Sequence, residues 1–233
     1  VNQAAKWSHM LGGQANPGVT IRSIINRGGE QGAQHSQALH AWFAHVPGLR
    51  VVMPSTVADA RDLLIASVLC NDPVMYIDDR WLYDQEDDLP PVVELDLTNQ
   101  QPVVSIVGSD ITIVASGHAS LLAREAAEQL KNEGILVEVV DIRVLNPFHA
   151  EEIIKSVKKT KNLLAIDSGW ISGGFSAEII AKVVEQLPVD CLNNPPTRLA
   201  LPDAPAPVSR VLEKAYYTTT DDVVNIVKKI VKS

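Results

Sequence analysis

The feature that most constrains the fold is an alternation of short apolar runs with longer helix-like segments. Runs rich in β-branched residues at 19–25, 49–53 and 74–77 alternate with predicted helices at 36–45 and 56–69. Strands joined through helices run parallel, and the helices cover the faces of the sheet. The alternation therefore predicts an α/β fold with a parallel sheet.

A polar segment at 84–105 interrupts the alternation, which then restarts. Four acidic residues precede Pro90-Pro91 and a polar run follows, which is the composition of a linker. The charge divides here too, because residues 1–98 carry a net −6 and residues 99–233 a net −2. We therefore expect two domains, residues 1–97 (including most of the linker) and residues 98–233. In the second, the predicted strands are 111–115, 136–141 and 163–167, and the predicted helices are 120–133, one from His149, 174–186 and 221–231.

The composition argues against several classes of function. The formal net charge is −8 and no block of Lys and Arg stands out, so no nucleic-acid partner is expected. The longest apolar runs, such as 111–115, fall far short of the roughly 20 residues that span a bilayer, and no signal peptide opens the chain. We therefore expect an intracellular protein without a membrane partner. Cys70 and Cys191 lack neighbouring cysteines, which indicates reduced thiols.

A series of specific motifs runs in order through nearly the whole chain. They are Gly32-Ala33-Gln34-His35-Ser36-Gln37, 42–54, Asn71-Asp72-Pro73-Val74, 141–147, Asp167-Ser168-Gly169-Trp170 and 173–179. The series resembles the beta subunit of the thiamine-diphosphate-dependent component of pyruvate and branched-chain 2-oxo acid dehydrogenase complexes. The resemblance implies a pyrimidine-type domain followed by a transketolase C-terminal-like domain.

The resemblance also implies that the first domain is truncated. The family's general acid/base glutamate lies upstream of the position that matches Val1, so we expect an incomplete first sheet with an exposed edge. The family holds the diphosphate of the coenzyme and its Mg²⁺ through a Gly-Asp-Gly motif on the alpha subunit, and no such motif occurs here. The chain is therefore expected to share thiamine diphosphate with a partner chain and to be inactive alone.

The same resemblance implies the partners and the compartment. An alpha subunit and a beta–beta contact would build a heterotetramer, which could dock on a lipoamide acyltransferase core. Asn193 falls where some beta subunits place an aspartate for that docking, and loss of the charge would weaken it. The family is cytoplasmic in bacteria and lies in the mitochondrial matrix in eukaryotes.

His35 is the predicted catalytic residue, because it follows a strand and a glycine-rich loop, where α/β sheets open ligand crevices. The resemblance implies that it faces the coenzyme and donates a proton during acyl transfer to lipoamide. The alternative is a histidine that caps the next helix. Gln34, Arg22 and Arg27 are the predicted substrate- or cofactor-side residues, and Arg22 could instead form a structural ion pair. We interpret His40 as a surface or subunit-contact residue.

The segment 67–72 matches a family K⁺ site built from backbone carbonyls and an acidic side chain. Asp72 could supply an oxygen, but Cys70 stands where the family has an aspartate, and thiols suit hard cations badly. An ordinary helix C-terminus is the alternative. The tripeptide Ser116-Gly117-His118 follows a strand of the second domain and is expected to have an organising role.

Two other functions remain open from the sequence. The segment 22–29 departs from the dehydrogenase pattern, which favours a transketolase-like synthase that does not use lipoamide. The absence of the glutamate instead favours a catalytically silent scaffold or dimerisation module. The leading hypothesis is the beta-subunit part of an enzyme that decarboxylates pyruvate or a related 2-oxo acid and transfers the acyl group to lipoamide.

Overall fold

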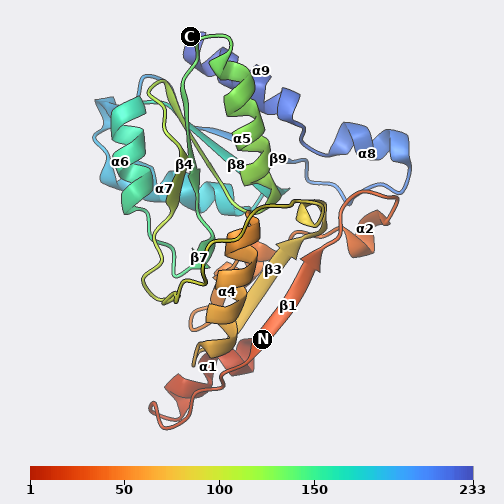
Figure 1. Ribbon diagram of the computed structural model, residues 1–233, viewed down its shortest axis with the longest axis vertical. Coiled ribbons are helices and arrows are strands. Elements are labelled where there is room, and N and C mark those ends of the chain that lie inside the picture. Colours follow the sequence, from red (N-terminus) through yellow and green to blue (C-terminus); the bar gives the residue numbers. More distant parts are fainter. Residues whose placement is uncertain (233) are drawn as a thin grey trace.

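Two β-sheets, each packed against helices, form the framework of the molecule (Figure 1). The computed structural model describes residues 1–232. The strands are β1 (Thr20–Ile25), β2 (Arg50–Val52), β3 (Val74–Asp79), β4 (Val103–Ile106), β5 (Ile111–Ala115), β6 (Val137–Asp141), β7 (Val144–Asn146), β8 (Leu163–Trp170) and β9 (Thr197–Leu201). The helices are α1 (Asn2–Met10), α2 (Gly32–His35), α3 (His40–Ala44), α4 (Val57–Leu69), α5 (His118–Lys131), α6 (Glu151–Thr160), α7 (Phe175–Gln186), α8 (Arg210–Tyr216) and α9 (Thr220–Lys232), with 3-10 turns η1 (Arg80–Leu82) and η2 (Val189–Cys191).

The first sheet has the strand order β1-β3-β2-β7, and its first three strands are parallel, as the alternation predicts. All of β3 is buried except the half-buried Asp78, which is typical of a strand covered on both faces. Ile25 lies opposite Asp79 in the register, so β1 and β3 end at the same level. Their carboxyl ends therefore form one edge, from which the glycine-rich loop leaves.

Strand β7 comes from the second half of the chain and pairs with β2 in the antiparallel direction. Val52 lies opposite Val144, and the backbone N–H of Met53 donates to the carbonyl of Arg143 at 2.7 Å. The first sheet therefore receives an edge strand from the second half, which the sequence analysis did not predict. The β1 edge carries no further strand within the described residues.

The second sheet has the order β4-β6-β5-β8-β9, and only β4 runs antiparallel to its neighbour. Successive strand residues point to opposite faces. Ile113 and Val139 pack in the cluster formed with α5 and α9, whereas Val114 and Val140 pack in the cluster formed with α6 and α7. Helices therefore cover both faces of this sheet, and the predicted α/β class is confirmed.

One apolar cluster runs through both halves of the molecule. It joins Val51 and Met53 of the first half to Ile142, Leu145 and Ile153 of the second, and all five are buried. Because the burial of these side chains depends on both halves, the two sheets pack as one unit. No helix within residues 1–232 is long and apolar enough to cross a bilayer.

The helix predicted at 36–45 is confirmed only in its second part, as α3. Residues 36–39 separate α3 from α2, and there the Ser36 hydroxyl donates to the carbonyl of Asn26 at 3.1 Å. The end of the predicted linker is also wrong, since 103–106 form β4. Strand β9 and helix α8 were not predicted.

Candidate functional site

The glycine-rich loop 26–32 leaves the common carboxyl edge of β1 and β3. Gly28, Gly29 and Glu30 all have positive φ, a conformation that costs a non-glycine residue such as Glu30 free energy. A Cβ on Gly28 would lie 2.6 Å from the Trp81 ring, so this position also requires the absence of a side chain. The sequence thus folds the loop tightly against η1.

Arg27 points back into the molecule and forms a buried ion pair with Asp79 at the end of β3. Burial raises the pKa of Asp79, and the Arg27 guanidinium opposes that shift. Asp79 also accepts a hydrogen bond from the backbone N–H of Trp81 at 3.1 Å. The guanidinium of Arg27 lies 5.5 Å from the centre of the Trp81 ring, which is a cation–π distance.

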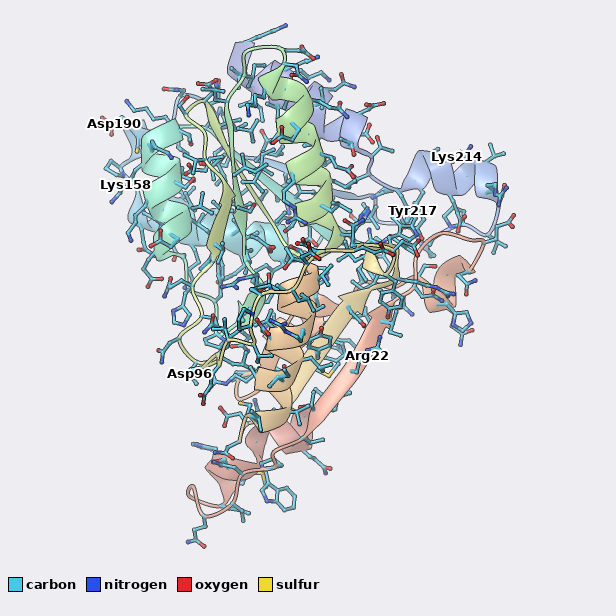
Figure 2. The ribbon with its side chains drawn as sticks, in the orientation of Figure 1. Arg22, Asp96, Lys158, Asp190, Lys214 and Tyr217 are labelled. Carbon is cyan, nitrogen blue, oxygen red and sulfur yellow. The ribbon has the colours of Figure 1, made fainter. Side chains whose placement is uncertain are left out.

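Trp81 contacts the second half of the chain through two further rings. His118 at the start of α5 and Tyr217 after α8 pack edge-on to it, with ring centres 5.0 and 5.4 Å away. Glu213 of α8 adds a polar contact, because both of its carboxylate oxygens accept the backbone N–H of Glu30, at 3.0 and 3.1 Å. Figure 2 places Tyr217 and Lys214 beside this junction. The second half therefore holds the loop in place.

The predicted site residues do not all meet. His35 ends the short helix α2, lies exposed and lines none of the described cavities, and Gln34 beside it is exposed too. Arg22 on β1 is exposed and donates to Asp78 at 2.5 and 3.0 Å and to Tyr83 at 2.7 Å. Arg22 thus forms the ion pair that the sequence analysis offered as its alternative, while Arg27 is buried.

His40 is buried, so its interpretation as a surface or subunit-contact residue is wrong. Its Nε2 lies 2.8 Å from the carboxylate of Asp167 in β8, and only 1% of the residue is exposed. Burial alone would raise the pKa of Asp167. His40 and the backbone N–H groups of Gly169 and Ser176 outweigh it and lower that pKa to about 2. The sequence could not show this contact, because the two residues are 127 positions apart.

Asp72 uses its Oδ2 oxygen in an ion pair, and its role at a K⁺ site stays a prediction. Its carboxylate accepts two hydrogen bonds from Arg50, at 2.6 and 2.9 Å. No group of three or more His, Cys, Asp or Glu side chains that could hold a metal occurs in the part of the chain that the structure describes. The structure places Asp72 shortly after the end of α4, in an ion pair with Arg50.

A buried polar cluster that the sequence analysis missed joins the two halves. Asp141 accepts hydrogen bonds from the hydroxyls of Ser55, in the first half, and Ser120, in α5. The Arg124 guanidinium donates to the hydroxyl oxygen and to the backbone carbonyl of Ser55, each at 3.0 Å. Burial raises the pKa of Asp141 to about 6, and nearby Asp59 adds to the shift, against the lowering by Ser55, Arg124 and Ser120. The cluster couples stability to pH.

Each half of the chain matches a known protein family. Residues 1–85 match the family "Transketolase, pyrimidine binding domain", and residues 102–223 match "Transketolase, C-terminal domain". A solved split-gene transketolase, described as an inactive β4 tetramer, shares the fold with a TM-score of 0.75 at 24% identity, over 92% of this chain and 66% of that one. The fold and its matches thus define a transketolase-like chain with pyrimidine-type and C-terminal domains.

The curated relatives narrow this class. The pyruvate dehydrogenase E1 component subunit beta of Rickettsia felis is 35% identical over 99% of this chain and 70% of its own length. The beta subunit of acetoin:2,6-dichlorophenolindophenol oxidoreductase from Bacillus subtilis is 35% identical over 97% of this chain and 66% of its own, and the Rhizobium meliloti pyruvate dehydrogenase E1 subunit beta is matched over 50% of its length. The chain therefore belongs to the transketolase-like family that contains the pyruvate dehydrogenase E1 beta subunits. It spans between half and 70% of the length of these relatives.

Proposed function

We propose that this chain acts as beta-subunit part of a thiamine-diphosphate-dependent 2-oxo acid dehydrogenase, together with an alpha-type partner chain. The observation that carries the proposal is about 35% identity to E1 beta subunits along nearly the whole chain. The substrate would be pyruvate or a related 2-oxo acid, and the acyl group would pass to lipoamide. The domains would divide at residues 97 and 98.

The residues present fit only one side of a thiamine diphosphate site. The described chain has no metal-ligand cluster for Mg²⁺, so the partner chain would hold the diphosphate and its metal. The coenzyme would supply the carbanion chemistry when bound. This chain would contribute the loop edge at the carboxyl ends of β1 and β3, where α/β sheets bind ligands.

Within that assembly, we assign His35 the donation of a proton to a lipoamide sulfur during acyl transfer. Its exposure at the end of α2 supports this, because a group that serves a partner chain and a mobile substrate must be accessible. Imidazole is the common proton donor near neutral pH. Gln34 lies beside it, while Arg22 and Arg27 would act by holding the loop edge through Asp78 and Asp79.

The test compares His35→Ala with His45→Ala in the assembled enzyme, because both histidines are exposed and lie ten positions apart. Lipoamide-dependent turnover should fall roughly 10²–10⁴-fold in the His35 variant, the usual loss for a positioned proton donor. Turnover with an artificial electron acceptor should fall much less, and His45→Ala should change neither rate. If both turnover rates fall equally in the His35 variant, His35 acts in a step before acyl transfer. If neither rate falls, His35 is only a residue at the end of a helix and the assignment is wrong.

Acetoin is a second candidate substrate. The Bacillus subtilis relative, whose name gives acetoin as its substrate, is as similar to this chain as the pyruvate dehydrogenase subunits are. The ratio of kcat/KM for pyruvate to that for acetoin in the assembled enzyme decides between them.

A further inference from the structure

Two neighbouring hollows lie where the second half of the chain meets the glycine-rich loop. Their volumes are 670 and 690 Å³, and they share Gly28, Gly29, Trp81 and His118 as lining residues. The first extends along the loop and η1, and the second extends along α8 and the residues that follow it. Because the four shared residues belong to both walls, the hollows form one cleft around Trp81, which we call the Trp81 cleft.

His118 lies in this cleft with no hydrogen bond to any described residue. It is 6% exposed, and its buried Nδ1 atom has no partner. Buried polar atoms usually have partners, so an imidazole that lines a cavity without one is a candidate ligand-binding group. Burial, followed by the charge of Arg27, lowers the pKa of His118 to about 3, which keeps the ring neutral. A neutral imidazole carries one N–H that can donate to a ligand.

The charges around the cleft favour an anion. Arg80, Arg210 and Lys214 line it, and none forms an ion pair within the described residues. Two carboxylates, those of Asp84 and Glu213, also line the cleft, and the Glu213 carboxylate accepts the backbone N–H of Glu30. The three cations exceed the two carboxylates by one positive charge, in a chain whose net charge is −8.

The remaining lining groups fit the body of a small organic molecule. Trp81 is 37% exposed, and Leu122 and Tyr217 add apolar surface to the lining. The buried Arg27 adds an Nε atom without a partner, although its charge is paired with Asp79. Apolar walls with a few convergent polar groups are the usual composition of a small-molecule site.

We propose that the Trp81 cleft binds a small organic anion that bears a carboxylate or phosphate group, with His118 donating a hydrogen bond and Arg80 and Lys214 supplying charge. The site is separate from His35, which does not line the cleft. It also spans both halves of the chain, so an occupant would tighten the contact between the glycine-rich loop and the segment after β9.

The test follows the imidazole resonances of the full chain by NMR during titration with sodium pyruvate, with inorganic phosphate and with sodium chloride at matched ionic strength. Loss of a signal in His118→Gln assigns the His118 resonance. If that variant does not fold, the histidine that stays neutral at pH 5 gives the same assignment. We expect a saturable shift of this resonance with pyruvate, phosphate or both, and the stronger of the two identifies the anionic group.

Surface variants test the charged groups without disturbing the core. Arg80→Gln and Lys214→Gln should each weaken binding about tenfold, the equivalent of one modest ionic contact. Lys131→Gln on α5 is the matched control, because this exposed lysine lies outside the cleft and should leave the affinity unchanged. The proposal is overturned if neither anion shifts His118 at about 20 mM, a weak-binding limit, if sodium chloride gives the same shift, or if the control weakens binding as much as the cleft variants.

Discussion

Arg27, in the loop after β1, forms a buried ion pair with Asp79, whereas Arg22 on β1 and Asp78 form a pair that is open to solvent on the arginine side. Both pairs consist of an arginine and an aspartate, but one is buried and the other is partly exposed to solvent. Removing one partner of a buried pair leaves an uncompensated charge in a medium that solvates it poorly, whereas an exposed pair contributes little. The two arginines therefore give a matched comparison.

We predict that Arg27→Met lowers the free energy of unfolding by about 3–5 kcal/mol near neutral pH, and that Arg22→Met lowers it by about 1 kcal/mol or less. The pKa of Asp79, which burial already raises, should rise further without Arg27, so the loss should shrink as the pH falls and Asp79 takes up a proton. Urea unfolding at pH 8 and pH 5 measures both effects. Equal losses in the two variants would contradict the assignment of Arg27 as a buried charge.

The raised pKa of Asp141 predicts a pH dependence of stability. Its pKa is raised to about 6 in the folded state, above the ordinary value near 4 in the unfolded chain, so the folded state binds the proton more tightly. Its contribution to stability is therefore complete at low pH and is lost as the pH rises from about 4 to about 6, by about 3 kcal/mol in total.

Asp141→Asn, which resembles the protonated acid, should be more stable than the parent at pH 7 and equal to it below about pH 4. Thermal unfolding across this range measures the difference. A parent chain that gains stability relative to the variant as the pH rises would show that Arg124 and the two serines outweigh burial.

At the scale of elements, the contact between α8 and the glycine-rich loop determines how the loop is held. Glu213 is buried, and the only hydrogen bonds of its carboxylate to described residues come from the Glu30 backbone N–H. Hydrogen bonds to a charged group contribute about 1.5–3 kcal/mol. Glu213→Gln should therefore speed hydrogen exchange of the Glu30 amide by about 10- to 100-fold, with a small change in global stability.

Glu185→Gln on α7 is the matched control, because this exposed glutamate has no hydrogen bond to a described residue. Hydrogen exchange measured by mass spectrometry on peptides that cover 26–35 distinguishes the variants. Unchanged exchange in Glu213→Gln would mean that the positive-φ glycines and Trp81 alone hold the loop.

The elements that the sequence predicted correctly are those whose pattern is local. Strands β5, β6 and β8 are continuous apolar runs bounded by polar turns, and α9 has an apolar face at helical spacing. Strand β7 has three residues, and its strand character depends on pairing with β2 across the molecule. At the break between α2 and α3, Ser36 bonds to the carbonyl of Asn26, a side-chain contact that a hydrophobic pattern does not reveal.

In the candidate site too, features set by adjacent sequence could be predicted, and contacts between distant residues could not. The position of His35 after a strand and a glycine-rich loop could be predicted, because both features lie in adjacent sequence. The ring contacts of Trp81 could not, since His118 and Tyr217 come from the second half of the chain. His40 was misplaced for the same reason, because its burial depends on Asp167.

At the scale of the whole molecule, the two sheets share one apolar cluster and the second half supplies β7 to the first sheet, so the two halves pack as one unit. The Trp81 cleft and a smaller cavity lined by Asp78, Asp79 and Tyr83 lie at the carboxyl edge of the first sheet. The described residues offer no metal-ligand cluster at this edge. We propose that this chain supplies one side of a coenzyme site, with the diphosphate and metal held by a partner chain.

Calorimetric titration of thiamine diphosphate with Mg²⁺ into the isolated chain tests this claim most directly. The account predicts no binding in the sub-micromolar range and no turnover of pyruvate by the chain alone, because affinity for the coenzyme depends mainly on its charged diphosphate and the metal. Addition of the alpha-type partner should produce tight binding. Sub-micromolar binding by the isolated chain would contradict the division of labour between the two chains.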